Sequence, residues 1–167
     1  DRVVDNGVAT GTEPTCPGTS CLHILTENPS ASDGNFFVDP QGTGGVLELY
    51  CDMTDGGWTR VSNETFDGGP TNTWTRNGST YATTTSCGSF GTIFGGFNQL
   101  GAGASLNTVI DLLAVSHTEA RVELDYIFVD SWDNESGTVD IDGSRVWSER
   151  RWYSSGSQQC GQNYSNW

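Results

Sequence analysis

The sequence predicts a mainly β protein, in which a small disulfide-stapled α/β subdomain precedes an antiparallel, jelly-roll-like β-sandwich. Short strand-like apolar runs recur along the chain, and turns rich in glycine, aspartate and asparagine separate them. Five cysteines occur in 167 residues, which suits a small unit whose core is supplemented by covalent links. We therefore expect an extended N-terminal arm at residues 1–15, the subdomain at 16–62 and the sandwich at 63–167.

The charge of the chain excludes several classes of function. Its 21 acidic residues outnumber 7 basic ones, which gives a net charge of -14. Every basic residue is arginine, so lysine chemistry is absent, and clustered cations for a nucleic acid partner are missing. No apolar run is long enough to span a bilayer, so we expect no membrane insertion.

The first 15 residues form a polar arm whose aliphatic side chains are Val3, Val4 and Val8. One interpretation is a frayed terminus. The other is that the arm adds as a strand to a neighbouring subunit through backbone hydrogen bonds. In that case the partners are copies of the chain itself, in a homo-oligomer or filament, and deletion of residues 1–12 abolishes assembly while the fold stays intact.

The elements of the small subdomain follow from local patterns. Residues 21–25 form an apolar run that predicts at least one helical turn, and strands are expected at 34–40 and 46–53. The Asp-Gly-Gly sequence at residues 55–57 predicts a hairpin turn, because these residues tolerate the positive φ angles of a tight reversal. A third strand then begins at Trp58.

The same region carries an ordered series of cysteine, aromatic, Asp-Pro and Asp-Gly-Gly-Trp positions. The series comprises Cys21, Leu25, Gly34, Phe36, Phe37, Asp39, Pro40, Tyr50, Cys51, Asp52, Met53, Asp55, Gly56, Gly57, Trp58, Thr59 and Val61. In order and spacing it resembles the opening of a fibrinogen C-terminal-like domain. The resemblance covers residues 20–61 and implies an extracellular α/β module with a Cys21–Cys51 disulfide. The later calcium loop and ligand pocket of that family have no counterpart here, so its lectin-like binding is not carried over.

The remaining cysteines and the sequons also favour export. Cys87 and Cys160 are the natural second bridge, and Cys16 is left as a free thiol or an interchain link. Five buried thiols in a cytosolic protein are the alternative. The absence of a CxxC pair argues against an ordinary zinc site. We expect an extracellular or cell-surface protein with candidate glycan sites at Asn63, Asn77, Asn134 and Asn163.

The second half of the chain reads as a different all-β unit. Glycines interrupt the apolar residues of 90–113 too often for a long helix. A strand is expected over 120–133, with Val122, Leu124, Tyr126 and Phe128 on one face, and a hairpin is expected around Asp142-Gly143. Residues 116–147 are similar to strand-loop-strand modules of large secreted bacterial and protist proteins, a resemblance that implies no settled activity.

Acidic residues offer one candidate metal site. Asp130, Asp133, Glu135 and Asp140, with Asp142 beside them, have spacings at which carboxylates converge on calcium, the one cofactor we consider. A solvated acidic loop is the alternative, which we prefer in so acidic a chain.

Aromatic residues offer a candidate sugar contact. Of the C-terminal aromatics, Trp132 lies on an expected loop, where an exposed ring could stack on a sugar, although core packing is the commoner role of such rings. No G-x-S-x-G sequence occurs, and carboxylate pairs are expected by abundance alone, so we expect no enzyme.

These observations lead to two functional hypotheses. The first is a non-enzymatic secreted structural glycoprotein that assembles through its arm into an extracellular filament, coat or appendage. The second is a lectin-like, carbohydrate-binding adhesion module, for which calcium is a candidate cofactor.

Overall fold

The chain forms two compact units, and the computed structural model describes residues 9–112, 117–129, 132–152 and 160. Unit 1 comprises residues 1–63 and 110–121, and unit 2 comprises residues 64–109 and 122–167. The division after residue 63 lies one position from the expected domain boundary. The return of 110–121 to unit 1 was not expected from the sequence.

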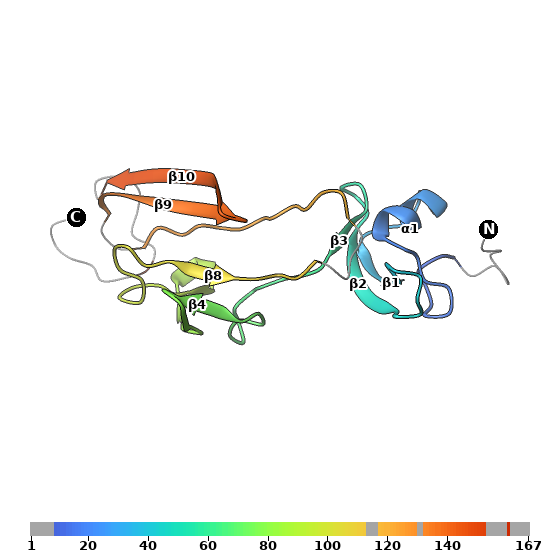
Figure 1. Cartoon of the computed structure of the whole chain (residues 1–167), viewed down its shortest axis with the longest axis horizontal. Coiled ribbons are helices and arrows are strands. Elements are labelled where there is room, and N and C mark those ends of the chain that lie inside the picture. The colour runs from blue at the N-terminus through green and yellow to red at the C-terminus, as the bar shows by residue number, and fades with distance from the viewer. Residues whose placement is uncertain (1–8, 113–116, 130–131, 153–159, 161–167) are drawn as a thin grey trace. The chain divides into compact units, whose positions relative to one another are not determined.

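The described residues of unit 1 include one short α-helix beside a three-stranded sheet (Figure 1). Ser20 caps the N-terminus of helix α1 (Cys21–Glu27), because its side-chain oxygen accepts a hydrogen bond of 3.0 Å from the His23 N–H. The sheet has the order β1-β2-β3 and all its pairs are antiparallel. Its strands are β1 (Gly34–Val38), β2 (Leu47–Asp52) and β3 (Trp58–Arg60). The helix and the three strands expected from the sequence are thus confirmed.

Glycine is required at the turn between β2 and β3. Gly56 and Gly57 have φ angles of 92° and 79°, which L-residues rarely adopt. A Cβ on Gly57 would also lie 2.8 Å from the Leu22 Cα, so this glycine lets the turn approach the backbone of α1. The Asp-Gly-Gly sequence therefore determines the hairpin turn and also allows α1 to pack closely against it.

The core of unit 1 is small and closed by a disulfide. Cys21, Ile24 and Cys51 are fully buried, Met53 is almost so, and the bond between Cys21 and Cys51 joins α1 to β2. Its partly buried neighbours are Leu25, Ala31 and Phe36. So few apolar side chains provide little hydrophobic stabilisation, which makes the covalent link important.

Residues 9–15, which the sequence assigned to the arm, pack within unit 1 against α1 and β1. Gly11 is buried, and its carbonyl accepts a hydrogen bond of 2.8 Å from the Phe37 N–H of β1. A Cβ on Gly11 would meet the Ile24 side chain at 2.5 Å. A deletion that leaves the fold intact therefore ends at residue 8, because deletion of 1–12 removes this contact.

The described residues of unit 2 form three antiparallel sheets. The first has the order β5-β4-β8, the second pairs β6 with β7, and the third pairs β9 with β10. The strands are β4 (Trp74–Arg76), β5 (Ser79–Thr80), β6 (Thr84–Ser86), β7 (Thr92–Phe94), β8 (Leu106–Thr108), β9 (Asp133–Ile141) and β10 (Ser144–Trp152), with a 3-10 turn, η1 (Gly88–Phe90). The mainly β class is confirmed, and the sandwich arrangement stays a prediction.

Aromatic packing and a second disulfide hold unit 2 together. Phe94 of β7 stacks on Phe66 with ring centroids 4.9 Å apart, and it contacts Trp74 at 5.0 Å and Tyr81 at 5.3 Å. The buried Cys87 is bonded to Cys160, so both disulfides are the pairs expected from the sequence. Within the described ranges, neither helix has the length and apolar character of a membrane span.

Among the described strands, β9 and β10 form the longest pair (Figure 1). Its turn is formed by Asp142 and Gly143, whose φ angles of 49° and 76° fit the expected Asp-Gly turn. The strand expected over 120–133 is not found, because residues 117–129 are assigned to no strand and β9 begins only at Asp133. A strand needs a backbone partner, and β9 takes β10 instead.

Candidate functional site

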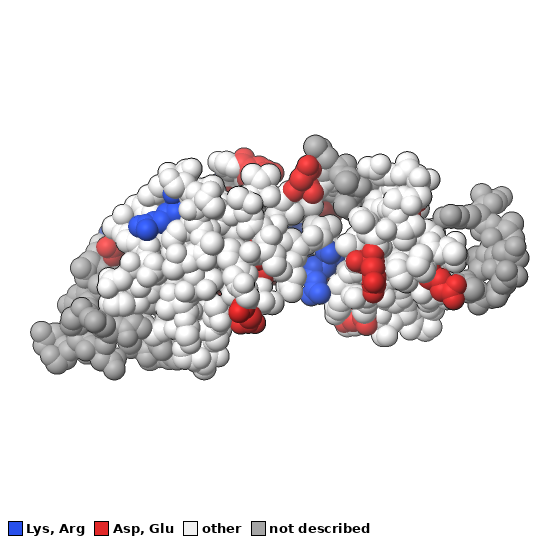
Figure 2. Space-filling view, turned by 90° about the horizontal axis from the view of Figure 1, so that it is seen from below, with Lys and Arg blue, Asp and Glu red and all other residues white. Residues whose placement is uncertain are grey.

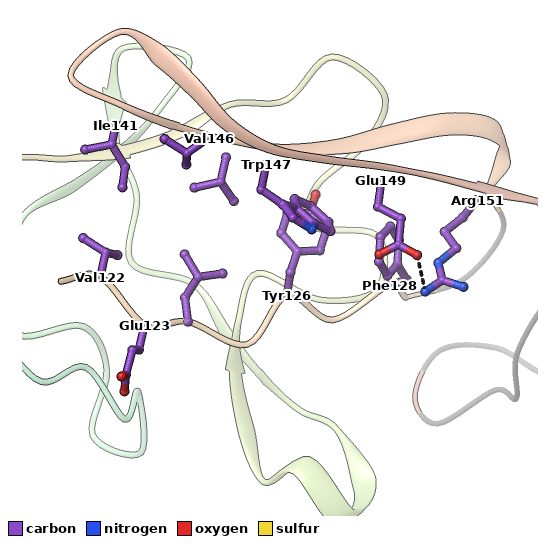
Figure 3. Close-up of a pocket in the computed structure, with 11 residues that line it drawn as sticks. Val122, Glu123, Tyr126, Phe128, Ile141, Val146, Trp147, Glu149 and Arg151 are labelled. Carbon is purple, nitrogen blue, oxygen red and sulfur yellow. Dashed lines mark ion pairs between the residues drawn. The ribbon is translucent and has the colours of Figure 1, made fainter. Parts of the chain in front are cut away.

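One candidate site is an apolar groove in unit 2, between residues 122–128 and the β9–β10 hairpin (Figure 3). It has a volume of about 550 Å³. The first wall carries Val122, Leu124, Tyr126 and Phe128, the four residues expected to share a face. The hairpin wall carries Val139, Ile141, Val146 and Trp147, with Glu123, Glu149 and Arg151 completing the lining. The expected face is thus confirmed, although its segment is not a strand.

The two walls of the groove meet through aromatic rings. Tyr126 lies 5.0 Å from Trp147 and 5.1 Å from Phe128, measured between ring centroids. The Tyr126 ring rests on the backbone of β9 at Gly137, where a Cβ would lie 2.9 Å from the ring. Partial burial raises the pKa of the Tyr126 hydroxyl. These contacts close one part of the groove.

The aliphatic part of the groove is open. Val122, Leu124 and Val146 expose 56%, 54% and 57% of their surface, far more than core residues do. Figure 3 shows Val122 on one wall and Ile141 and Val146 on the other, with their side chains pointing toward each other across the groove. The groove is therefore a concave apolar surface in contact with solvent.

One ion pair borders the groove. Arg151 Nη2 lies 2.6 Å from the Glu149 carboxylate, and the Arg151 guanidinium lies 5.0 Å from the centre of the Phe128 ring (Figure 3). The two charges offset each other locally. The rest of the lining, apart from Glu123 and the Tyr126 and Trp147 rings, is hydrocarbon, so the groove favours an apolar occupant.

The acidic residues proposed for calcium do not form a site among the described residues. Asp130 lies outside the described residues, as does the side chain of Asp133, and Glu135 is exposed on β9. Arg145 on β10 donates hydrogen bonds to Asp140, and the second of these measures 3.2 Å. These hydrogen bonds lower the pKa of the Asp140 carboxyl. No cluster of three or more potential ligands is present in the described part of the chain.

The Trp132 ring packs against neighbouring residues and is not fully exposed to solvent. Its ring meets Phe128 edge-on with centroids 4.8 Å apart, and its indole N–H donates a hydrogen bond of 3.1 Å to the Val129 carbonyl. The ring is half-buried. Packing of this kind leaves less of the ring face for a sugar.

The remaining expected residues are spread over the two units. Cys16 carries a free, half-buried thiol, and Val3, Val4 and Val8 lie outside the described residues. Among the sequons, Asn63 and Asn77 are exposed and Asn134 is half-buried, whereas Asn163 lies outside the described residues.

Two carboxylates are held by backbone amides. The N–H groups of Thr54 and Met53 both donate hydrogen bonds of 2.8 Å to Asp33, and these lower the pKa of its carboxyl. At Glu64, burial acts to raise the pKa, but hydrogen bonds from the backbone of Thr71 and Asn72 outweigh burial and lower it. Both carboxylates hold loop backbone in place through these hydrogen bonds, and neither lines the groove.

Charged side chains are scattered over the face that Figure 2 shows. Acidic side chains lie there mostly among uncharged residues, and arginine side chains are visible on the same face. Comparison of the chain with protein-family models, with curated proteins and with solved structures finds no match.

Proposed function

We propose that the chain is a non-enzymatic, secreted structural glycoprotein that assembles with copies of itself through its N-terminal arm. The observation that carries the proposal is the open apolar groove of unit 2. A concave apolar surface left in contact with water raises the free energy of the isolated chain, and such surfaces mark interaction sites. Assembly removes this surface from water.

An extracellular location is part of the same proposal. Two disulfides suit an oxidising compartment, because cytosolic reductants keep most thiols reduced. The exposed Asn63 and Asn77 are accessible for glycan attachment. The fibrinogen-like subdomain, which also belongs to the proposal, is of a kind found outside cells.

A carbohydrate-binding module is the second candidate, because Tyr126 and Trp147 line the groove. Aromatic rings stack on the apolar faces of sugars. Here the two rings contact each other at 5.0 Å, which covers part of their faces, so we rank this function second. A glycan array run with and without a calcium chelator tests it, and a calcium-dependent signal on one sugar class would place it first.

The test of assembly uses size-exclusion chromatography and electron microscopy of the full chain and of a chain lacking residues 1–8. We expect oligomers from the full chain and monomers from the truncated one. Asp5→Asn is the matched control, because it changes the charge of the arm but keeps its valines. A full chain that stays monomeric at high concentration contradicts the proposal, and oligomers that survive the truncation contradict the role of the arm.

A further inference from the structure

We propose that the groove between residues 122–128 and the β9–β10 hairpin receives residues 1–8 of a second copy of the chain. This inference rests on the proposed function, because it names the surface that the arm meets. The arm side chains that enter the groove are valines, and the surface that receives them is the aliphatic part lined by Val122, Leu124, Ile141 and Val146.

The shape of the groove fits an extended chain. Residues 122–128 form one wall and side chains of the hairpin form the other, so the groove lies between a segment outside any strand and a pair of strands. β9 and β10 pair only with each other among the described strands. A further extended segment can therefore lie along the hairpin, as in other cases where a peptide joins a sheet.

The chemistry of the arm matches the lining. Residues 1–8 lie outside the described residues and include three valines. In an extended chain, side chains two positions apart share a face, so Val4 and Val8 point the same way, roughly 13 Å apart. Both are aliphatic, as are the four residues that line the open part of the groove. An arm bound in an extended conformation would therefore present two apolar side chains on one face.

A polar occupant fits the open part less well. Val122, Leu124, Ile141 and Val146 have no side-chain donor or acceptor. A sugar or a charged ligand bound there would lose hydrogen bonds to water without replacing them. An aliphatic segment loses none from its side chains.

Charge gives the contact a specific salt dependence. Each copy has a net charge of -14, so two copies repel each other, and added salt screens this repulsion. A contact made by valines should therefore strengthen as salt rises. A contact made by ion pairs should weaken.

The test is sedimentation velocity over a dilution series, with one variant on each wall of the groove. Leu124→Asp and Val146→Asp each place a charge in the lining and should raise the concentration of half-association at least tenfold. Val109→Asp is the control, because Val109 is 87% exposed and lies in unit 2 outside the groove. It should change that concentration less than about twofold. Near-ultraviolet circular dichroism checks that each variant is folded.

The outcomes separate this inference from the proposed function. If loss of residues 1–8 abolishes assembly while both folded groove variants assemble normally, the groove is not the acceptor, although the function stands. If the full chain never assembles, both the proposed function and the inference about the groove are contradicted. If assembly weakens as salt rises, an ionic contact replaces the one proposed here. Loss of assembly in both groove variants and in the truncated chain, with the control unaffected, supports the inference.

Discussion

The two units each contain one disulfide, and they differ in whether a group of apolar residues forms a closed cluster or lines an open groove. In unit 1 the helix and sheet enclose Cys21, Ile24, Cys51 and Met53, and little of this cluster reaches solvent. In unit 2 the hairpin and residues 122–128 leave an apolar groove open. Both units contain antiparallel strands, but among the described residues only unit 1 has an α-helix, and residues of that helix form part of its core.

The difference shows which features allow a small unit to bury its apolar side chains. In unit 1 a disulfide and a glycine turn bring the helix onto the sheet, so a few side chains suffice. In unit 2 the second disulfide ties Cys87 to Cys160, and neither cysteine lines the groove. An apolar surface that its own chain leaves open is available to a partner.

The largest expected effect is the loss of the unit 1 disulfide. Replacing Cys21 and Cys51 together by alanine should lower the free energy of unfolding of unit 1 by roughly 2–5 kcal/mol, because the link constrains the unfolded chain and forms part of the core. Denaturant unfolding followed by circular dichroism measures it. Cys16→Ala is the matched control, since it removes a free thiol from the same unit. Equal stability of the two variants would contradict the importance given to this link.

The glycine turn of unit 1 offers a sharper comparison. Gly57→Ala should cost about 2–4 kcal/mol, because it adds contact with the Leu22 backbone to the strain of a positive φ. Gly56→Ala has similar φ strain but open space, so it should cost about 1–2 kcal/mol. The difference between their unfolding free energies isolates the packing of the turn on α1. No difference would mean that α1 shifts freely to make room.

These residues also show how much of the fold could be predicted. The helix, strands and turn of unit 1 could be predicted because each has a local pattern, as the Asp-Gly-Gly turn does. The strand at 120–133 could not, since alternation at Val122 and Leu124 identifies a face but not a backbone partner. Whether an extended segment becomes a strand depends on distant residues.

Part of the groove could be predicted from the sequence. One wall was identified from alternation, but Val146 and Ile141 of the other wall read only as hairpin residues. Nothing local indicates that a hairpin faces residues 122–128 instead of pairing with them. The pairing of Asp140 with Arg145 was equally invisible, because it depends on the register across the hairpin.

A smaller effect is expected where residues 122–128 rest on the hairpin of unit 2. Gly137→Ala should push the Tyr126 ring away and destabilise the unit by about 1 kcal/mol, with altered Trp147 fluorescence. Gly101→Ala is the control, because a Cβ there meets nothing within 4 Å. Unchanged fluorescence in Gly137→Ala would show that the ring does not rest on this strand.

The smallest expected effect is a change in the stability of unit 1 at low pH. The pKa of Asp33 is lowered in the folded chain, so its stabilisation is present above the unfolded value of about 3.8 and is lost as pH falls through the lower folded value. Asp33→Asn should therefore lower the denaturant midpoint of unit 1 near pH 7, and the gap to the parent chain should close below pH 3.8. If the difference in denaturant midpoint between Asp33→Asn and the parent chain stayed constant with pH, the charge of the Asp33 carboxylate would not be the cause of the stabilisation.

The most direct measurement of the central claim is disulfide trapping between two copies, with Cys16 replaced by serine in both. One copy carries Val4→Cys in its arm and the other carries Val146→Cys in its groove, and a bridge forms only if their Cα atoms come within about 7 Å. We predict an interchain dimer on a non-reducing gel, and no more than background when Val109→Cys replaces Val146→Cys. Equal trapping at both positions, or none at either, would contradict the claim that the arm of one copy fills the groove of another.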